Sequence, residues 1–270
     1  MGRLDGKRAV VIGASLEGNM GQAIARRFRV EGAEVVVGSR NLAASEKFAR
    51  SIGAHAAVCD ITRRTDIRAL AAFAKEKIGG VDIAVNSTGL ALGAPFLKFG
   101  ERDLDTMIAL QFKGAFFFLQ EMVAAMLGSG GSIIQISSGV AQHSTTVDGG
   151  FEAYMGTKAG IDQVVRAVAN QFGRAGIRVN SIAAGHTDTP MHHANFGGDI
   201  PAWMKACFAD ATPMGRYGTC EDVAAAAVWL ASDECFMTGD VLQANGGLTL
   251  RRNPLKADLE RWQRDWEQRG

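Results

Sequence analysis

The sequence has little of what marks secreted, membrane-spanning or metal-dependent proteins. Only 4 of its 270 residues are cysteine and 5 are proline. The cysteines form no CxxC pair and no histidine stands at a metal-ligand spacing from them, so we predict a reducing compartment and no metal site. The N-terminus runs almost at once into a strand pattern, which leaves no room for a signal peptide, and no uncharged apolar run reaches membrane-spanning length. These absences predict a cytoplasmic protein.

Charge of either sign is not in excess. The sequence has 29 Lys and Arg against 28 Asp and Glu, a formal net charge of +1. This total gives no electrostatic reason to expect a nucleic-acid or membrane partner. Glycine, by contrast, is abundant at 33 residues, which suits many tight turns between strands and helices.

Short apolar runs alternate with longer helical patterns. Several runs are apolar without alternation, as expected of strands buried on both faces. The order predicts one Rossmann-like α/β domain over residues 1–250, with a doubly wound, mostly parallel, seven-stranded sheet. Residues 251–270 follow as a helical tail. The predicted strands are 8–13, 34–39, 56–60, 81–86, 131–137, 177–183 and 239–244, and the predicted helices are 21–31, 41–51, 64–78, 101–127, 154–174 and 219–232, with a short one near 200–210.

A glycine-rich loop, "GASLEGNMG" (13–21), lies between the first predicted strand and the first helix. A nucleotide pyrophosphate needs backbone N–H groups at a helix N-terminus and glycines that let the chain approach. An ordinary glycine-rich turn stays open as an alternative, because the spacing is longer than GxGxxG. On the nucleotide interpretation the loop contributes Gly13, Ser15, Gly18, Met20 and Gly21.

The end of the second predicted strand should meet the adenosine ribose. An acidic residue there would bond the 2′-hydroxyl, but the sequence has Ser39 and Arg40. A hydroxyl and a guanidinium suit a 2′-phosphate, so we predict NADP(H) in preference to NAD(H). Glu17 in the glycine loop argues the other way, and a solvated loop arginine would look the same, so NAD(H) stays the alternative.

Six further motifs follow one another in order. They are "CD" (59–60), "NSTG" (86–89), "ISS" (136–138), "YMGTK" (154–158), "AGHTDTPM" (184–191) and "ANGG" (244–247). Over residues 7–247 this ordered set resembles the short-chain dehydrogenases/reductases. The resemblance implies an oxidoreductase that binds NAD(P), forms homo-oligomers (a tetramer or a dimer) and acts on a small molecule. It also implies cofactor contacts at Asp60, Ile61, Asn86, Gly89, Tyr154, Lys158, Gly185, Thr187 and Thr189.

The spacing of Tyr154 and Lys158 fits acid–base chemistry on a carbonyl. Free tyrosine, with a pKa of about 10, is a poor proton donor at neutral pH. Lys158 lies one helical turn away, so its ammonium can favour the phenolate and bring the tyrosine pKa down. Ser138 or Ser137 would hydrogen-bond the substrate oxygen, and the family pattern favours Ser138, the second of the pair. A surface Tyr–Lys pair is the more frequent meaning of YxxxK alone, but the surrounding motifs make that interpretation a poor fit.

Several positions depart from the family pattern. Gln111 stands where the family has a helical Asn, so a proton relay would survive or be rearranged. The stretch "HSTTVDGGFE" (143–152) lengthens the gap from the serine to the tyrosine and predicts a larger loop at the site entrance. The N-terminal loop also resembles the enoyl-thioester reductase branch, whose Tyr-x6-Lys spacing would put tyrosine at position 151. That residue is Phe151, so we expect carbonyl/alcohol chemistry, with enoyl reduction as the alternative and a non-catalytic nucleotide-binding scaffold as another.

Residues 186–218, here named the lid segment, should cover the substrate. Its apolar side chains predict a substrate with an apolar portion or a packed cover. The histidines of the lid segment are expected to be solvated. The tail carries an apolar stripe at helical spacing, which we expect to pack on a neighbouring subunit or beside the substrate entrance. The lid side chains are Met191, Phe196, Trp203, Met204, Phe208 and Met214, the histidines are His186, His192 and His193, and the stripe is Leu255, Leu259, Trp262 and Trp266.

Overall fold

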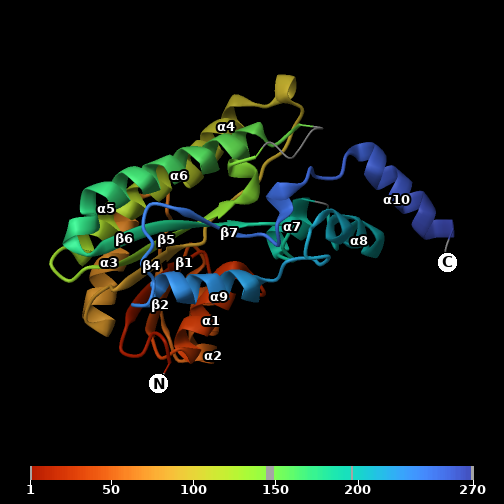
Figure 1. Cartoon of the computed structure of the whole chain (residues 1–270). Helices are drawn as coiled ribbons and strands as arrows, with labels where there is room; N and C mark the ends of the chain where they lie inside the picture. The colour runs from red at the N-terminus through yellow and green to blue at the C-terminus, as the bar shows by residue number, and fades with distance from the viewer. Residues whose placement is uncertain (1, 144–148, 196, 269–270) are drawn as a thin grey trace.

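Seven strands form one sheet in which every neighbouring pair is parallel. The computed structural model describes residues 2–143, 149–195 and 197–268. The strand order is β3-β2-β1-β4-β5-β6-β7, a doubly wound sheet that confirms the predicted fold class (Figure 1). Each predicted strand is present, with ends shifted by one or two residues. The strands are β1 (Arg8–Ile12), β2 (Glu34–Ser39), β3 (His55–Val58), β4 (Ile83–Asn86), β5 (Gly131–Ser138), β6 (Ile177–Ala184) and β7 (Val241–Ala244).

Helices cover both faces of the sheet (Figure 1). Along β1, Ala9 and Val11 belong to one buried apolar cluster, whereas Val10 and Ile12 belong to the other. Since successive strand residues point to opposite faces, β1 must be apolar at every position from Ala9 to Ile12. The helices are α1 (Met20–Val30), α2 (Leu42–Ile52), α3 (Arg64–Ile78), α4 (Glu101–Met107), α5 (Ala115–Met126), α6 (Glu152–Phe172), α7 (Pro190–Asn195), α8 (Ala202–Ala211), α9 (Cys220–Ala231) and α10 (Lys256–Gln268).

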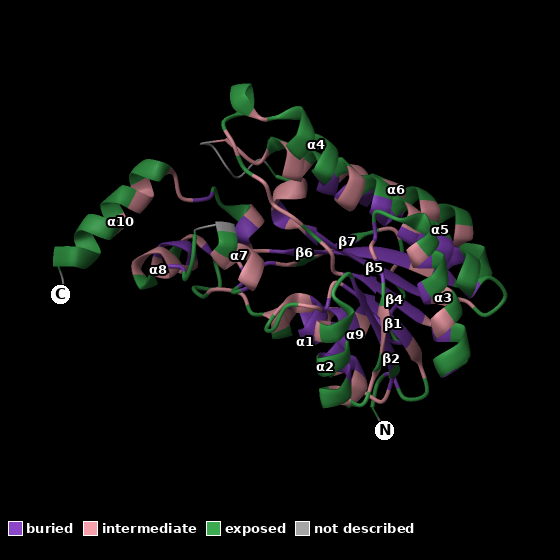
Figure 2. Cartoon of the chain, turned by 180° about the vertical axis from the view of Figure 1, so that it is seen from behind, coloured by how far each residue is buried: buried purple, intermediate pink, exposed green. Residues whose placement is uncertain are grey.

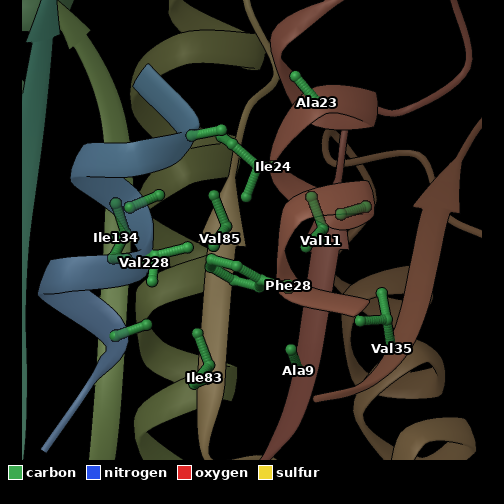
Figure 3. Packing of buried hydrophobic residues seen from close by; sticks show 14 of the residues in the cluster. Ala9, Val11, Ala23, Ile24, Phe28, Val35, Ile83, Val85, Ile134 and Val228 are labelled. Atoms are coloured by element: carbon green, nitrogen blue, oxygen red, sulfur yellow. The ribbon is translucent and has the colours of Figure 1, made fainter. Parts of the chain in front are cut away.

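The face covered by α1 and α9 is packed most simply. Figure 3 shows Phe28 of α1 and Val228 of α9 directed at the side chains of the central strands, including Val85 of β4. Phe28 is fully buried, and burying a side chain of this size stabilises the fold by about 1.5–3 kcal/mol. On the other face, α3, α5 and α6 contribute the second cluster. The helices on both faces therefore hold in place the strands whose carboxyl ends carry the site.

The predicted single helix 101–127 is interrupted. Between α4 and α5 the backbone forms a π-helix, η2 (Ile108–Gly114), with Gln111 buried inside it. Single π turns inside α-helices are frequent at functional sites. Gly114 ends the turn, and a Cβ there would lie 2.7 Å from the carbonyl oxygen of Ile61, so only glycine lets this helix approach the loop after β3. The whole segment Glu101–Met126 is long and apolar enough to cross a membrane, but half of its most apolar window is buried against the protein, as in a core helix.

The tail forms the predicted helix, but it packs differently from the other helices. α10 contacts α8 of the lid segment and stands out at one end of the molecule (Figure 1). None of its described residues is fully buried, and Figure 2 shows it largely exposed. Leu255, Leu259 and Trp262 are half-buried, whereas Trp266 is exposed. The apolar stripe is therefore only partly covered within one chain.

Candidate active site

The glycine loop connects the end of β1 to the N-terminus of α1. Asn19 caps α1: its Oδ1 accepts from the Gln22 backbone N–H at 2.9 Å, and its Nδ2 donates to the Gly13 carbonyl at 2.8 Å. Gly13 has φ +89°, and a Cβ there would lie 2.7 Å from the backbone of Ser87. The loop is thus held against the β4 end, with the uncapped N–H groups of α1 facing the same region, an arrangement that favours a phosphate.

At the end of β2, Ser39 and Arg40 take different positions. Ser39 is buried, and its hydroxyl is bonded to the Asn41 backbone and to the Ser45 hydroxyl at 2.7 Å. Arg40 is exposed. Burial alone would raise the pKa of the Asp60 carboxyl, but hydrogen bonds from Thr62 and the charges of Arg40 and Arg63 hold it below its usual value. Arg40 and Asp60 both line the cavity described below.

Asn86, at the end of β4, acts on the backbone of its own loop. The side chain is buried, and Oδ1 accepts from the Thr88 N–H at 3.0 Å and from the Thr88 hydroxyl at 2.7 Å. These bonds fix the loop "STG" beside the glycine loop. A backbone-shaping role of this kind is typical of Asn, which bonds to groups two residues on.

A cavity of about 640 Å³ runs along the carboxyl ends of the strands. It begins at Arg40 and Asp60, passes the glycine loop and ends under the lid segment. Its position fits the rule that open α/β sheets bind ligands beyond the carboxyl ends of the strands, where the strand order reverses, here between β1 and β4. The predicted residues that line it are Gly13, Ser15, Met20, Ser39, Arg40, Asp60, Ile61, Gly89, Ser138, Tyr154, Lys158, Gly185, Thr187 and Thr189.

Four predicted residues lie outside the lining of this cavity. Gly18 is in the exposed part of the loop, and Asn86 is buried beneath it. Gly21 is buried, and a Cβ there would lie 2.6 Å from the Gly13 carbonyl oxygen, so it lets α1 start close to β1. Gln111 lies behind Lys158: its Nε2 donates to the Thr157 hydroxyl at 3.0 Å and its Oε1 accepts from the Leu90 N–H at 3.4 Å. Asn86, Gly21 and Gln111 therefore support the site from beneath the residues that line it.

Ser138, Tyr154 and Lys158 come together at the inner end of the cavity. Ser138 ends β5, and the other two lie one turn apart on α6. A hydrogen bond joins the side chains of Ser138 and Tyr154. Lys158 is buried, and its Nζ donates to the Ile136 carbonyl at 2.7 Å and lies 5.9 Å from the centre of the Tyr154 ring. The serine, the phenol and the ammonium therefore converge on one space, as the sequence predicted.

The protonation of this group differs from the sequence-based expectation. Burial raises the pKa of Tyr154, and the hydrogen bond with Ser138 opposes that rise without cancelling it. Burial lowers the pKa of Lys158 to about 8, and the charge of Asp162 opposes that fall. We expected Lys158 to lower the tyrosine pKa, but its Nζ is turned to the Ile136 carbonyl. In this geometry the phenol stays protonated and the ammonium stays mostly charged at neutral pH.

Two of the three lid-segment histidines are not where the sequence predicted them. His186 and His192 are not solvated: both line the cavity, and His186 lies 4.1 Å from the Phe208 ring centre. Burial lowers the pKa of His186 to about 4, so it is neutral at pH 7. His193 does pair at the surface, with Asp188. Of the apolar lid side chains, Met191 and Phe208 line the cavity and Met214 is exposed. Phe196, like residues 144–148 of the loop 143–152, lies outside the described residues.

The tail reaches the site through one residue of the predicted apolar stripe, Leu259, and through two residues that the sequence did not single out. Asn253, Pro254 and Leu259 line the cavity. Asn253 is buried, and its Oδ1 lies 3.1 Å from His186 Nε2. The apolar stripe predicted that the tail docks somewhere, but Asn253 precedes the helical pattern and so carried no periodic signal. Other lining residues, for which the sequence predicted no cofactor contact and no catalytic role, are Leu16, Asn19, Ala91, Leu110, Val140 and Phe151.

Comparison with known proteins identifies the family. The family model described as "Enoyl-(Acyl carrier protein) reductase" matches residues 13–249. The chain is 36% identical to 3beta-hydroxysteroid dehydrogenase 1 of Eggerthella lenta over 92% of this chain and 95% of that protein. It is 31% identical to the 3-oxoacyl-[acyl-carrier-protein] reductase FabG of Thermotoga maritima over 92% and 100%. The chain is a short-chain dehydrogenase/reductase.

The structure agrees with that identity. A solved gluconate 5-dehydrogenase from Burkholderia cenocepacia, in complex with NADP and tartrate, superposes with a TM-score of 0.84. The two chains are 28% identical, over 92% of this chain and 97% of that one. As a short-chain dehydrogenase/reductase the protein is an NAD(P)-dependent oxidoreductase, and its relatives act on small molecules.

Proposed function

We propose that this short-chain dehydrogenase/reductase interconverts a carbonyl and a secondary alcohol with NADP(H), and that Tyr154 is its general acid and base. The observation that carries the proposal is the Ser138–Tyr154 hydrogen bond, with Lys158 beside it, at the inner end of the cavity that begins at the glycine loop. When bound, the nicotinamide cofactor supplies the hydride in reduction and accepts it in oxidation.

Each side chain has a distinct part in the proton transfer. In reduction, Tyr154 donates its phenolic proton to the carbonyl oxygen, and Ser138 donates a hydrogen bond to the same oxygen as charge develops on it. The Lys158 ammonium stabilises the phenolate that remains, since it is the nearest cation in the cavity lining. Gln111 holds the loop beside Gly89 in place and keeps the back of the site polar.

The residues present fit a dinucleotide. The glycine loop and the start of α1 offer backbone donors for a pyrophosphate, and the cavity continues from there to Tyr154. Thr187 and Thr189 lie between these ends, on the lid segment. The exposed guanidinium of Arg40 at the outer end supports a 2′-phosphate.

Arg40→Ala tests the cofactor preference. Charge-assisted hydrogen bonds contribute about 1.5–3 kcal/mol, so the affinity for NADPH should fall by about 10–100-fold. The affinity for NADH should stay the same, because NADH has no 2′-phosphate. Fluorescence titrations at one salt concentration measure both. Lys47→Ala, which removes an exposed cation of α2 outside the cavity lining, is the matched control, and an equal loss for both cofactors would refute the role of Arg40.

The substrate end of the cavity favours a substrate with an apolar portion. Lys158 is the one charged side chain there among the described lining residues. The walls are Ala91, Val140, Phe151, Met191, Phe208, Pro254 and Leu259, with the neutral His186 and the amide of Asn253 as polar groups. A pocket of this kind suits an uncharged body with few hydrogen-bonding groups.

Shortening the tail tests its part in substrate binding. A chain ending at Arg252 loses Asn253, Pro254 and Leu259 and should raise KM for an apolar ketone by about 10-fold or more, since each buried apolar side chain contributes about 1.5–3 kcal/mol. The affinity for NADPH should hold. A chain ending at Trp262 keeps all three lining residues and is the control. Equal KM values for the two shortened chains would contradict this role.

Enoyl-thioester reduction is the second candidate, because the matching family model carries that description. The catalytic residues support it less. The tyrosine of the Tyr-x6-Lys spacing would stand at position 151, and Phe151 lines the cavity there without a proton to give. Carbonyl chemistry therefore remains the proposal.

We also propose that the protein forms homo-oligomers in the cytoplasm, as the sequence predicted. Large apolar side chains recur every four residues along α4, η2 and α5 and are exposed in the single chain. Such a stripe is typical of an interface between copies. Sedimentation equilibrium measures the mass, and a monomer at micromolar concentration would refute the proposal. The stripe consists of Leu104, Ile108, Phe112 and Phe116.

A further inference from the structure

A buried carboxylate lies directly beneath the proposed catalytic residues. Asp162 is 2% exposed and lies one helical turn after Lys158 on α6. Its Oδ2 accepts from the Ser137 hydroxyl at 2.7 Å, and its Oδ1 accepts from the Ser181 hydroxyl at 2.6 Å. Burial raises the pKa of the Asp162 carboxyl, and the two hydroxyls oppose that rise because they donate to the ionised form. An ionised carboxylate at this depth costs free energy unless a cation compensates it.

Among the charged side chains, Lys158 favours the Asp162 carboxylate most strongly, and Lys158 is itself buried. Side chains four residues apart on a helix are neighbours, about 5–6 Å between Cβ atoms. The interaction acts in both directions: the charge of Asp162 favours the ammonium of Lys158, and the ammonium favours the carboxylate. Taking either charge away would leave the other buried without its partner, which is the costly case for buried pairs.

The other groups around Asp162 leave Lys158 as its main charged partner. Arg166, one turn further along α6, also favours the carboxylate, and its Nη1 bonds to Gln163. In the described structure, the residues of β5 and β6 that bond to Asp162 contribute hydroxyls, not charges. Charged groups on the other elements packed against α6 are directed elsewhere. The charged side chains of α4, Lys113 of η2 and Arg174 of the short helix η4 (Gly173–Ala175) are exposed. Glu121 of α5 pairs with Arg64 and Arg68, and Arg178 of β6 bonds to the Leu230 carbonyl.

Asp162 also fixes the strand that carries Ser138. Lys158 holds the Ile136 carbonyl and Asp162 holds the Ser137 hydroxyl, so two consecutive residues of β5 are bonded to α6 immediately before Ser138. The bond to Ser181 extends the connection to β6, which pairs with β5 along this stretch. The carboxylate therefore joins α6, β5 and β6 at the depth of the proposed site.

We propose that Asp162 is a positioning residue with two effects. Its buried negative charge keeps Lys158 protonated, and its hydrogen bonds join α6, β5 and β6 so that Ser138 faces Tyr154. The proposal deepens the proposed function and rests on the role assigned there to Lys158. It adds a residue that touches neither substrate nor cofactor, because Asp162 is absent from the cavity lining. Hydrogen bonds that only hold β5 in place would not change the protonation of Lys158, so the two effects can be tested separately.

The pH profile of ketone reduction tests the counter-charge. Reduction by the wild type should fall at alkaline pH as Lys158, with its pKa of about 8, loses its proton. Asp162→Asn keeps the shape but removes the charge that raises the lysine pKa, so this fall should move to lower pH by about one unit or more. Ser181→Ala removes one hydrogen bond but leaves the carboxyl group in place, so its profile should move less than that of Asp162→Asn. An Asp162→Asn profile that is lower at every pH but falls at the wild-type pH would overturn the proposal.

A second measurement needs no turnover, so it stands even if the proposed reaction is wrong. Urea unfolding at pH 7 is compared for the wild type, Asp162→Asn, Lys158→Met and the double variant. Asp162→Asn should destabilise the wild type but be neutral or stabilising in the Lys158→Met background, where no buried ammonium needs a partner. The two effects should differ by at least about 10-fold in the unfolding equilibrium. If Asp162→Asn alone does not fold, a double variant at least as stable as Lys158→Met gives the same support. An equal loss of stability in both backgrounds would overturn the counter-charge.

Discussion

Tyr154→Phe is expected to lower the rate of carbonyl reduction by about 10²–10⁴-fold, the usual contribution of a positioned general acid. Phe keeps the ring, which packs in the cavity wall, and removes only the hydroxyl that bonds to Ser138. Cofactor affinity should change little, because the glycine loop and Arg40 are untouched. Single-turnover kinetics with saturating NADPH measure the chemical step directly.

The chain offers a matched control, since it has only two tyrosines. Tyr217 lies in the lid segment, outside the cavity lining, with its hydroxyl 2.8 Å from His192 Nδ1. Tyr217→Phe removes the same atom from a half-buried ring and should leave most of the turnover. Comparable losses in the two variants, or full turnover in Tyr154→Phe, would show that Tyr154 has no special part in the reaction.

Gly21→Ala should weaken the binding of either cofactor and destabilise the fold. Its Cβ would lie 2.6 Å from the Gly13 carbonyl oxygen and 3.1 Å from the Ala14 nitrogen. Both are backbone atoms, so α1 itself must shift. Overpacking of this kind costs about 1–3 kcal/mol of the free energy of unfolding. The shift moves the helix N-terminus away from the loop, and affinity should fall by about 10-fold or more for NADPH and NADH alike.

Gly173→Ala is the control for this effect. Gly173 has an ordinary φ of −57°, and a Cβ there meets no atom within 4 Å. The variant should match the wild type in urea unfolding and in cofactor titrations. Wild-type stability and affinity in Gly21→Ala would mean that α1 does not depend on this close contact.

The strands and most helices could be predicted because their signals are local. β1 and β4 are short and apolar on both faces, and the side chains of Asn19 and Thr219 cap α1 and α9. The π turn at Gln111 could not be predicted, because the apolar spacing continues through it. What forces the turn is the approach to the Ile61 carbonyl, which requires Gly114 and depends on tertiary packing.

The site, too, could be predicted where its signal is local and could not be predicted where it depends on tertiary contacts. The spacing of Tyr154 and Lys158 predicted that both face one space, and they do. The direction of the Lys158 ammonium depends on the Ile136 carbonyl of a strand 22 residues away, which no local pattern reports. The lid histidines were interpreted from their polarity, yet the rings of His186, His192 and Phe208 pack together and leave both histidines half-buried. The tail stripe predicted docking, but its partner α8 lies far earlier in the chain, before α9 and β7.

The most direct test of the carbonyl/alcohol assignment follows the hydride itself. NADPH carrying deuterium at C4 of the nicotinamide is incubated with the enzyme and a panel of neutral cyclic ketones and enoyl thioesters, and the products are analysed by mass spectrometry. If hydride is transferred to a carbonyl carbon, we expect deuterium on the carbinol carbon of an alcohol product. We also expect Tyr154→Phe to lose that product. Deuterium at the β-carbon of a saturated thioester, with none transferred to any carbonyl carbon, would contradict it.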